Sequence, residues 1–439
     1  MGPNGYNGQA KDGELMGAAV ASWSAPPHIL DMLNHYKEFF EQYPRQFWLI
    51  VFGVFISTAG ASMIMPFLMI YATDKLGLPL GQAVTLITIS AGTTIFMSFA
   101  AGYLADRVGR KLVMNLSLTI NGLAYLGMPF AVTYPSLAVL MFLIGFSNAF
   151  YSVGADAMLA DLVPAEKRAD GYAINRIMNN AGFAIGPAVG GVVAAISYNL
   201  AFLAGAVGML LYSGLLFFLA HETLRKGNEP ALDDVRKARG YGLVFRDHKY
   251  LTFIGIFSFG LIAPGMLWVL LAVYTKNNFG MPESVYGLIP MTNALMCVFV
   301  QYTVTRATRR YATLPVMAAG MLLYAIGVGS VSLMSGFWGF WLSMVILTLG
   351  ELTLLPTASK FVADIAPADM RGRYMSFYWL AWGFSRAVAP LIGAALNDRI
   401  GPHAIWMGGL LIGLTSMAGL VVLGGLGWYH EAAPVASEA

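Results

Sequence analysis

The sequence predicts an all-α integral membrane protein whose twelve transmembrane helices form two pseudo-symmetric six-helix bundles. Its 439 residues are 57% hydrophobic and only 11% charged, whereas a soluble domain carries about 25% charged residues. Charge-free runs such as Trp48–Tyr71 and Ala404–Trp428 have the length of about 20 residues that crosses a hydrocarbon core. An internal repeat and a one-sided distribution of basic residues complete the evidence for this fold.

The apolar runs mark twelve candidate spans. They lie near residues 46–72, 81–104, 112–131, 135–160, 170–196, 199–220, 251–275, 286–304, 313–334, 337–361, 373–396 and 403–428. We therefore expect a cytoplasmic tail at 1–44, bundles at 45–221 and 250–428, a cytoplasmic linker at 222–249 and a cytoplasmic tail at 429–439. Apolar residues at helical spacing from Ile29 to Tyr43 predict an amphipathic helix in the first tail.

Basic residues fall almost entirely on one side of the predicted membrane. Of the 26 Lys and Arg, only Lys75, Lys276 and Arg399 lie on the side opposite to the termini, while Arg176 and Arg386 lie within spans. Because basic loops are retained in the cytoplasm, we expect both termini there. The protein is then a multi-pass protein of the cell membrane.

The two halves resemble each other at one fixed offset of 203 residues. The run ADLVPAEKR at 160–168 recurs as ADIAPADMR at 363–371, and Pro187 recurs as Pro390. A single offset without gaps implies two bundles of the same build in parallel orientation. Repeats with a binding site at their interface are typical of secondary transporters.

The predicted turn between spans two and three concentrates charge in the run GYLADRVGRKL, residues 102–112. The run resembles the G-x-L-x-D-R-x-G-R-K loop of the major facilitator superfamily, with defining residues at Gly102, Asp106, Arg107, Gly109, Arg110 and Lys111. Arg110 is placed to pair with Asp161 at the end of span four. The resemblance implies that Asp106, Arg110 and Asp161 form a latch that holds the two halves together on the cytoplasmic side. The alternative is a topology signal, which the basic residues alone would provide.

Span five carries a second motif, GFAIGPAVGG at 182–191. It resembles the G-x-x-x-G-P-x-x-G-G pattern found mainly in proton-coupled exporters of the superfamily, through Gly182, Gly186, Pro187, Gly190 and Gly191. Glycines on one helix face permit close approach of another helix, and the proline permits a kink. The alternative is ordinary small-residue packing, which any membrane bundle uses.

Each half also carries one acid and one arginine within its spans. Glu351 and Arg386 lie roughly 20 Å from the cytoplasmic ends of spans ten and eleven at 1.5 Å per residue, so they could meet. Asp156 and Arg176 form a shallower set in spans four and five. Charge at mid-membrane costs roughly 2.5–3.5 kcal/mol, so these groups are either two structural salt bridges or functional groups. In the functional interpretation Glu351 carries a proton and Asp156 is a second titrating or substrate-attracting acid.

Further polar and aromatic residues are candidates for the lining of a central cavity. They are Asn148, Tyr151, Asn175, Asn179, Tyr378, Trp379 and Trp382. The sequence contains no phosphate-binding loop, no metal-ligand cluster and no catalytic constellation. We therefore expect no enzyme activity, no cofactor and no metal.

The resemblance implies a transporter with the major facilitator fold that works by alternating access. Gly350 with Glu351 also resembles the multidrug proton antiporters of the superfamily, although no Lys or Arg lies between Lys111 and Lys167, where many drug exporters carry one. We expect proton-coupled efflux of small lipophilic compounds, which could be cationic. An exporter or symporter of a specific metabolite, such as a sugar or a lysolipid, is the alternative, and a ligand-binding membrane sensor without transport is a third. The expected partners are a small-molecule substrate, protons and membrane lipid, with no nucleic acid, and the protein is expected to be a monomer.

Overall fold

The computed structural model describes residues 41–164, 167–224, 241–367 and 370–427, and these form helices and turns with no strand among them. The first bundle consists of α3 (Arg45–Ile70) with η1 (Tyr71–Lys75), α4 (Leu80–Val108), α5 (Arg110–Gly127) with η2 (Met128–Phe130), α6 (Tyr134–Leu162), α7 (Arg168–Ile196) and α8 (Tyr198–Leu219). The second consists of α10 (Tyr241–Val244), α11 (His248–Phe279), α12 (Glu283–Tyr286), α13 (Leu288–Phe299), α14 (Gln301–Thr308), α15 (Thr313–Ser330) with η5 (Val331–Leu333), α16 (Gly336–Ile365), α17 (Arg371–Arg399) and α18 (Pro402–Gly425).

The prediction of a twelve-helix membrane fold is confirmed. Ten described helices are long and apolar enough to cross a membrane, and the segment from Glu283 to Thr308 is an eleventh, bent by 57° between α13 and α14. Helix α5 with η2 occupies the place of the predicted span at 112–131. No feature of the sequence predicts the bend in the eighth span. There the Gln301 amide donates a hydrogen bond to the Leu352 carbonyl, which connects α14 to α16, and another to the Thr305 hydroxyl within α14.

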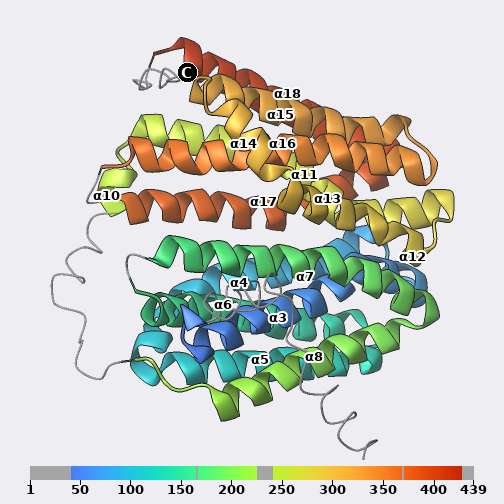
Figure 1. Cartoon of the computed structure of the whole chain (residues 1–439). Helices are drawn as coiled ribbons and strands as arrows, with labels where there is room; N and C mark the ends of the chain where they lie inside the picture. The colour runs from blue at the N-terminus through green and yellow to red at the C-terminus, as the bar shows by residue number, and fades with distance from the viewer. Residues whose placement is uncertain (1–40, 165–166, 225–240, 368–369, 428–439) are drawn as a thin grey trace, which may run out of the picture.

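The two bundles pack in the same way, and Figure 1 shows them as two separate groups of helices. Helix α3 packs against α7 and α8, as α11 packs against α17 and α18. Between the bundles, α4 packs against α17 and α7 packs against α12 and α13. Gly77 and Gly280, which the repeat pairs, both adopt a left-handed φ, of 63° and 62°, which glycine reaches without steric cost. The pseudo-symmetry predicted from the repeat is therefore a property of the fold.

The interface between the bundles has two ends, which differ in their residues. The end holding residues 102–112 and 306–310 is called the basic end, and the end holding residues 71–79 and 276–283 is called the distal end. One cluster of buried apolar side chains spans the second bundle and continues into the distal half of the first, through residues such as Phe67, Leu86 and Phe202. Apolar residues in the basic half of the first bundle form separate clusters. The buried core is thus shared between the bundles only toward the distal end.

Two expectations fall largely outside the described residues. The amphipathic helix predicted in the tail at 1–44 lies there except for its last residues, and so does the tail predicted at 429–439. The predicted linker at 222–249 is described only at its two ends. At the second of these ends, Asp247 caps α11 by accepting a hydrogen bond of 3.0 Å from the Tyr250 backbone amide, which stabilises the first turn.

Candidate functional site

The distal end of the interface is closed by direct contact between backbones. A Cβ atom at Gly191 of α7 would touch the backbone carbonyl of Glu283 in α12, and one at Gly287 would touch that of Pro187. Beside this contact, the Tyr198 hydroxyl of α8 donates a hydrogen bond of 2.5 Å to the Glu283 carboxylate. Lys276 pairs with the same carboxylate at 3.1 Å. The span-five motif thus contacts the other bundle, and a cluster of three polar side chains joins the bundles next to it.

The remaining glycines of the motif bring α7 against α3 in its own bundle. A Cβ atom at Gly182 would lie 2.9 Å from the Phe55 carbonyl oxygen, and one at Gly186 would lie 2.8 Å from that of Ala59. Gly190 meets Met63 in the same way. Any larger residue would push the two helices apart. The close packing predicted from the glycine spacing is therefore present on two sides of α7.

The second contact between the bundles joins α4 to α17. The Thr88 hydroxyl donates a hydrogen bond of 2.9 Å to the Ala387 carbonyl, and a Cβ atom at Gly383 would lie 2.9 Å from the Ile95 side chain. Ile95 lies near the middle of α4. Among the described residues, the hydrogen bonds and ion pairs between the bundles are this one and that of Tyr198, and both lie in the distal half of the interface.

Side-chain exposure along α7 reveals a cavity in the basic half. One stripe of the helix, at Tyr172, Arg176 and Phe183, is exposed, but its continuation from Pro187 to Ala194 is buried. Positions three, four and seven residues apart share a helix face, so exposure on this face stops at mid-depth. The opposite face stays exposed to the distal end, as a lipid-facing surface should, at Ile185, Val189, Val192 and Ile196.

Two more helices repeat this pattern. On α17, Trp379 and Arg386 are exposed, whereas Pro390 and Gly393 beyond them on the same side are buried. On α6, Asp156 is exposed and residues 144 and 145 deeper in the helix are buried. Three helices from two bundles thus border a central cavity that is open at the basic end and closed at the distal end.

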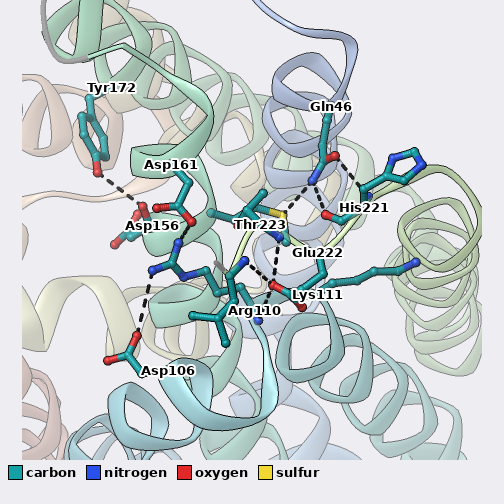
Figure 2. A network of polar contacts seen from close by, with 12 residues as sticks. Gln46, Asp106, Arg110, Lys111, Asp156, Asp161, Tyr172, His221, Glu222 and Thr223 are labelled. Atoms are coloured by element: carbon teal, nitrogen blue, oxygen red, sulfur yellow. Dashed lines mark hydrogen bonds and ion pairs between the residues drawn. The ribbon is translucent and has the colours of Figure 1, made fainter. Parts of the chain in front are cut away.

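The charged turn at the basic end forms a network within the first bundle (Figure 2). The Arg110 guanidinium of α5 pairs with Asp161 of α6, which confirms the predicted partner. Asp106 of α4 lies 4.0 Å from Arg110 and its side chain is 65% exposed. No hydrogen bond or ion pair links these three side chains to the second bundle in the described parts of the chain. The latch across the two halves therefore stays a prediction.

Glu222, which the sequence analysis missed, organises the same turn. Its carboxylate accepts hydrogen bonds of 3.0 Å from the backbone amides of Arg110 and Lys111, at the N-terminus of α5. Gly109 adopts a φ of 112°, which favours glycine, and a Cβ atom there would collide with the Glu222 carboxylate. A carboxylate at a helix N-terminus satisfies free amides and the helix dipole. Arg107 stacks on Tyr103 at 4.6 Å and Lys111 on Phe217 at 5.4 Å, so neither takes part in the ion pair.

Glu351 is held by an amide rather than by the arginine expected from its depth. The Asn293 side-chain amide of α13 donates a hydrogen bond of 2.9 Å to the Glu351 carboxylate and a second of 3.0 Å to the Thr348 hydroxyl. Glu351 and Arg386, which their depth alone would allow to meet, form no ion pair, because Arg386 lies on the cavity stripe of α17 while α16 presents Glu351 to α13. The cation that acts on Glu351 at longer range is Arg176 of the other bundle.

The shallower predicted pair is also absent. Asp156 and Arg176 form no ion pair, and both side chains are exposed. The Tyr172 hydroxyl donates to the backbone carbonyl of Asp156 at 3.4 Å, as Figure 2 shows, and the carboxylate has no hydrogen-bond or ion-pair partner among the described residues. Neither acid of the two sets therefore pairs with the arginine of its own bundle.

The predicted cavity residues divide into two groups. Trp379 is 64% exposed on the cavity stripe, and Trp382 one turn away is half-buried. The others serve helix packing at least in part. Asn148 accepts a hydrogen bond from Asn121, Asn179 donates one to Thr58, Tyr151 packs edge-on against Tyr212, Tyr378 stacks on Phe257, and Asn175 is half-buried between helices. Within the described ranges, no group of three His, Cys, Asp or Glu could hold a metal ion.

Comparison with known proteins agrees with this architecture. The family model of the Major Facilitator Superfamily matches residues 50–390 and 262–436. The chain is 27% identical to the uncharacterized MFS-type transporter YttB of Bacillus subtilis, over 85% of this chain and 94% of that protein. It is 26% identical to a Na(+), Li(+), K(+)/H(+) antiporter of Planococcus maritimus, over 77% of this chain and 86% of that protein. It is 24% identical to the quinolone resistance protein NorA of Staphylococcus aureus, over 86% of this chain and 96% of that protein. The crystal structure of the nucleoside transporter NupG shares the fold, with a TM-score of 0.74 at 13% identity over 87% of this chain and 99% of that one.

Proposed function

Because the chain belongs to the Major Facilitator Superfamily and is therefore a transporter, we propose that it exports small lipophilic compounds in exchange for protons. The observation that carries this proposal is Glu351, an acid at mid-depth of the bundle beside the cavity, hydrogen-bonded to Asn293. Similarity to NorA and to a cation/proton antiporter supports the same activity. The basic end and both termini would face the cytoplasm, and the protein would act as a monomer in the cell membrane.

The proposed cycle alternates between two closures of one cavity. With the basic end open, Glu351 releases its proton to the cytoplasm and substrate enters the cavity. The bundles then rock, the distal contact separates and the basic end closes through the latch of Asp106, Arg110 and Asp161. Glu351 takes a proton from outside as substrate leaves, and the protonated carboxyl returns without an uncompensated charge, whose burial is costly. Asp156, near the mouth of the cavity, would attract substrates with a positive charge.

Replacement of Glu351 by Gln tests the coupling. In proteoliposomes with an imposed pH gradient, Glu351→Gln should lose gradient-driven transport of lipophilic compounds, while exchange of substrate for substrate without a gradient should persist. Asp364→Asn is the matched control on the same helix, because Asp364 is exposed and pairs with Lys360 at the basic end. Gradient-driven transport by Glu351→Gln at the wild-type rate would show that another group carries the proton.

The alternative functions predict different proton movements in the same assay. A metabolite symporter would carry protons in the same direction as its substrate, and a sensor would produce no flux with any compound. Exchange of Na⁺ or K⁺ for protons is a second candidate function, because of the similarity to the antiporter of Planococcus maritimus. In that case, addition of the salt alone, without a lipophilic compound, would collapse the pH gradient.

A further inference from the structure

Arg386 is a cation in the central cavity that no carboxylate of the described residues contacts. It forms no hydrogen bond or ion pair with any residue that the structure describes, and its side chain is exposed on the cavity stripe of α17. Arg176, the other arginine of the cavity, acts electrostatically on Glu351. An arginine within a membrane span tends to be paired or functional, and Arg386 has no partner among those residues.

A second unsatisfied donor lies one turn away on the same helix. The indole Nε1 of Trp382 is buried and donates to no described acceptor, although the Tyr378 hydroxyl lies nearby without the geometry of a hydrogen bond. Trp382 and Arg386 are four residues apart, so their side chains are neighbours on one face. Buried donors without acceptors are rare. A buried donor without an acceptor, next to an unpaired arginine at the closed end of a cavity, indicates that an acceptor arrives with the ligand.

The internal repeat places Arg386 at the floor of the cavity. At the offset of 203 residues, Arg386 corresponds to Phe183, and Arg176 corresponds to Trp379. Each bundle therefore has one arginine and one aromatic residue at the same two levels. In the first bundle the aromatic residue is the deeper of the two, and in the second bundle the arginine is. Seven residues of helix separate the levels by about 10 Å. Arg386 lies at the deeper level, four residues before the buried Pro390, and Trp379 lies nearer the mouth.

We propose that Arg386 is an anion-binding residue of the substrate site and that the substrates are lipophilic compounds bearing a carboxylate, including zwitterions. A guanidinium binds a carboxylate through two parallel hydrogen bonds. Trp379 and Phe183 provide aromatic surface for the apolar body, and Asp156 is available to a positive group nearer the mouth. This inference rests on the proposed transport function and adds a carboxylate to the expected lipophilic compounds, which could be cationic.

A binding experiment with a matched pair of probes tests the proposal without involving proton coupling. Binding of 2-naphthoate and of its neutral amide, 2-naphthamide, is measured by calorimetry on the purified full-length protein. The wild type should bind the carboxylate at least tenfold more tightly, since a hydrogen bond to a charged group contributes about 1.5–3 kcal/mol, and each 1.4 kcal/mol is tenfold in affinity. In Arg386→Gln this preference should vanish while binding of the amide is unchanged.

Two further variants keep the outcome interpretable. Arg399→Gln, an exposed arginine at the distal end of the same helix, should keep the preference, and Arg386→Lys should retain part of it. A wild type without preference for the carboxylate, or a preference that survives Arg386→Gln, would overturn the proposal. Because the assay measures binding only, a failure of Glu351→Gln to uncouple transport would leave this result unaffected, and the two proposals fail separately.

Discussion

The two ends of the bundle interface are built from different kinds of contact. At the distal end, glycines bring the backbones of α7 and of α12 with α13 into direct contact, and one short hydrogen bond from Tyr198 to Glu283 lies beside them. At the basic end, the charged groups around Arg110 bind one another within the first bundle. The bundles share a core at one end and only border a cavity at the other.

This difference indicates how one cavity can open at either end. Where two backbones meet at a glycine, no side chain can change its conformation to keep a partial contact. The distal end is therefore either fully closed or separated. Long charged side chains can exchange partners over several ångströms, so the basic end can close through a new arrangement of groups that already exist. A rigid contact at one end and an adaptable network at the other give two states with distinct contacts, as a population shift requires.

Filling the glycine contact should have the largest effect. In Gly191→Ala the new Cβ would meet the Glu283 backbone, whose carbonyl carbon would lie 3.0 Å away. Overpacking costs about 1–3 kcal/mol, and here only in the distal-closed state, so the equilibrium should move about 5- to 150-fold toward the distal-open state. We expect transport to fall to background. Accessibility of a cysteine introduced in the cavity to a membrane-impermeant reagent added from the distal side should rise.

Gly214→Ala is the control for this variant, because a Cβ at Gly214 of α8 meets nothing within 4 Å. It should transport normally. Normal transport by Gly191→Ala, at wild-type expression and melting temperature, would show that the distal contact is not as rigid as the comparison requires.

Removing the hydrogen bond beside the glycines should have an intermediate effect. Tyr198→Phe deletes a bond to a charged acceptor, worth about 1.5–3 kcal/mol, that exists only while the distal end is closed. The distal-open population should rise at least tenfold by the same cysteine assay. Tyr134→Phe is the matched control, since the Tyr134 hydroxyl bonds to Thr85 at 2.7 Å within one bundle. Equal shifts in both variants would mean that Tyr198 contributes to general stability and not to the distal closure.

Features carried by local spacing were predictable from the sequence. Spans, repeat and glycine face follow from hydrophobic runs and from residue intervals along one helix, and the pairing of Arg110 with Asp161 follows from two helix ends that must meet at one membrane surface. The distal polar cluster was missed because Glu283 and Lys276 look like ordinary loop charges. Glu283 is buried beside Tyr198, to which it is hydrogen-bonded and which is 85 residues away from it in the sequence.

The charges within the spans show which features local spacing does not predict. Counting residues from a membrane surface gives the depth of Glu351 and Arg386, and on depth alone they could meet. It does not give the rotation of each helix about its axis, and that rotation presents Glu351 to Asn293 and leaves Arg386 in the cavity. Rotation is fixed by packing against neighbouring helices, which requires knowledge of both partners.

The smallest effects should appear at the basic end, where replacing each of the two acids around Arg110 should change stability by different amounts. Asp161→Asn removes the partner of an arginine that is only 16% exposed, and partly buried pairs cost more to break than the 0–1 kcal/mol of exposed ones. We expect a loss of about 1–2 kcal/mol, measured as a melting temperature lower by a few degrees. Asp106→Asn affects a carboxylate at 4.0 Å that is largely exposed, so the melting temperature should stay within one degree (less than about 0.5 kcal/mol).

The proposed latch also predicts an effect of Asp106 on access to the cavity, which a melting temperature does not measure. If Asp106 closes the basic end in the other state, Asp106→Asn should increase cavity accessibility from the basic side, although its melting temperature is unchanged. Asp161→Asn should lower the melting temperature and increase accessibility together. Unchanged accessibility in Asp106→Asn would reduce residues 102–112 to a topology signal with one structural ion pair, and the closure of the basic end would then have to come from the second bundle.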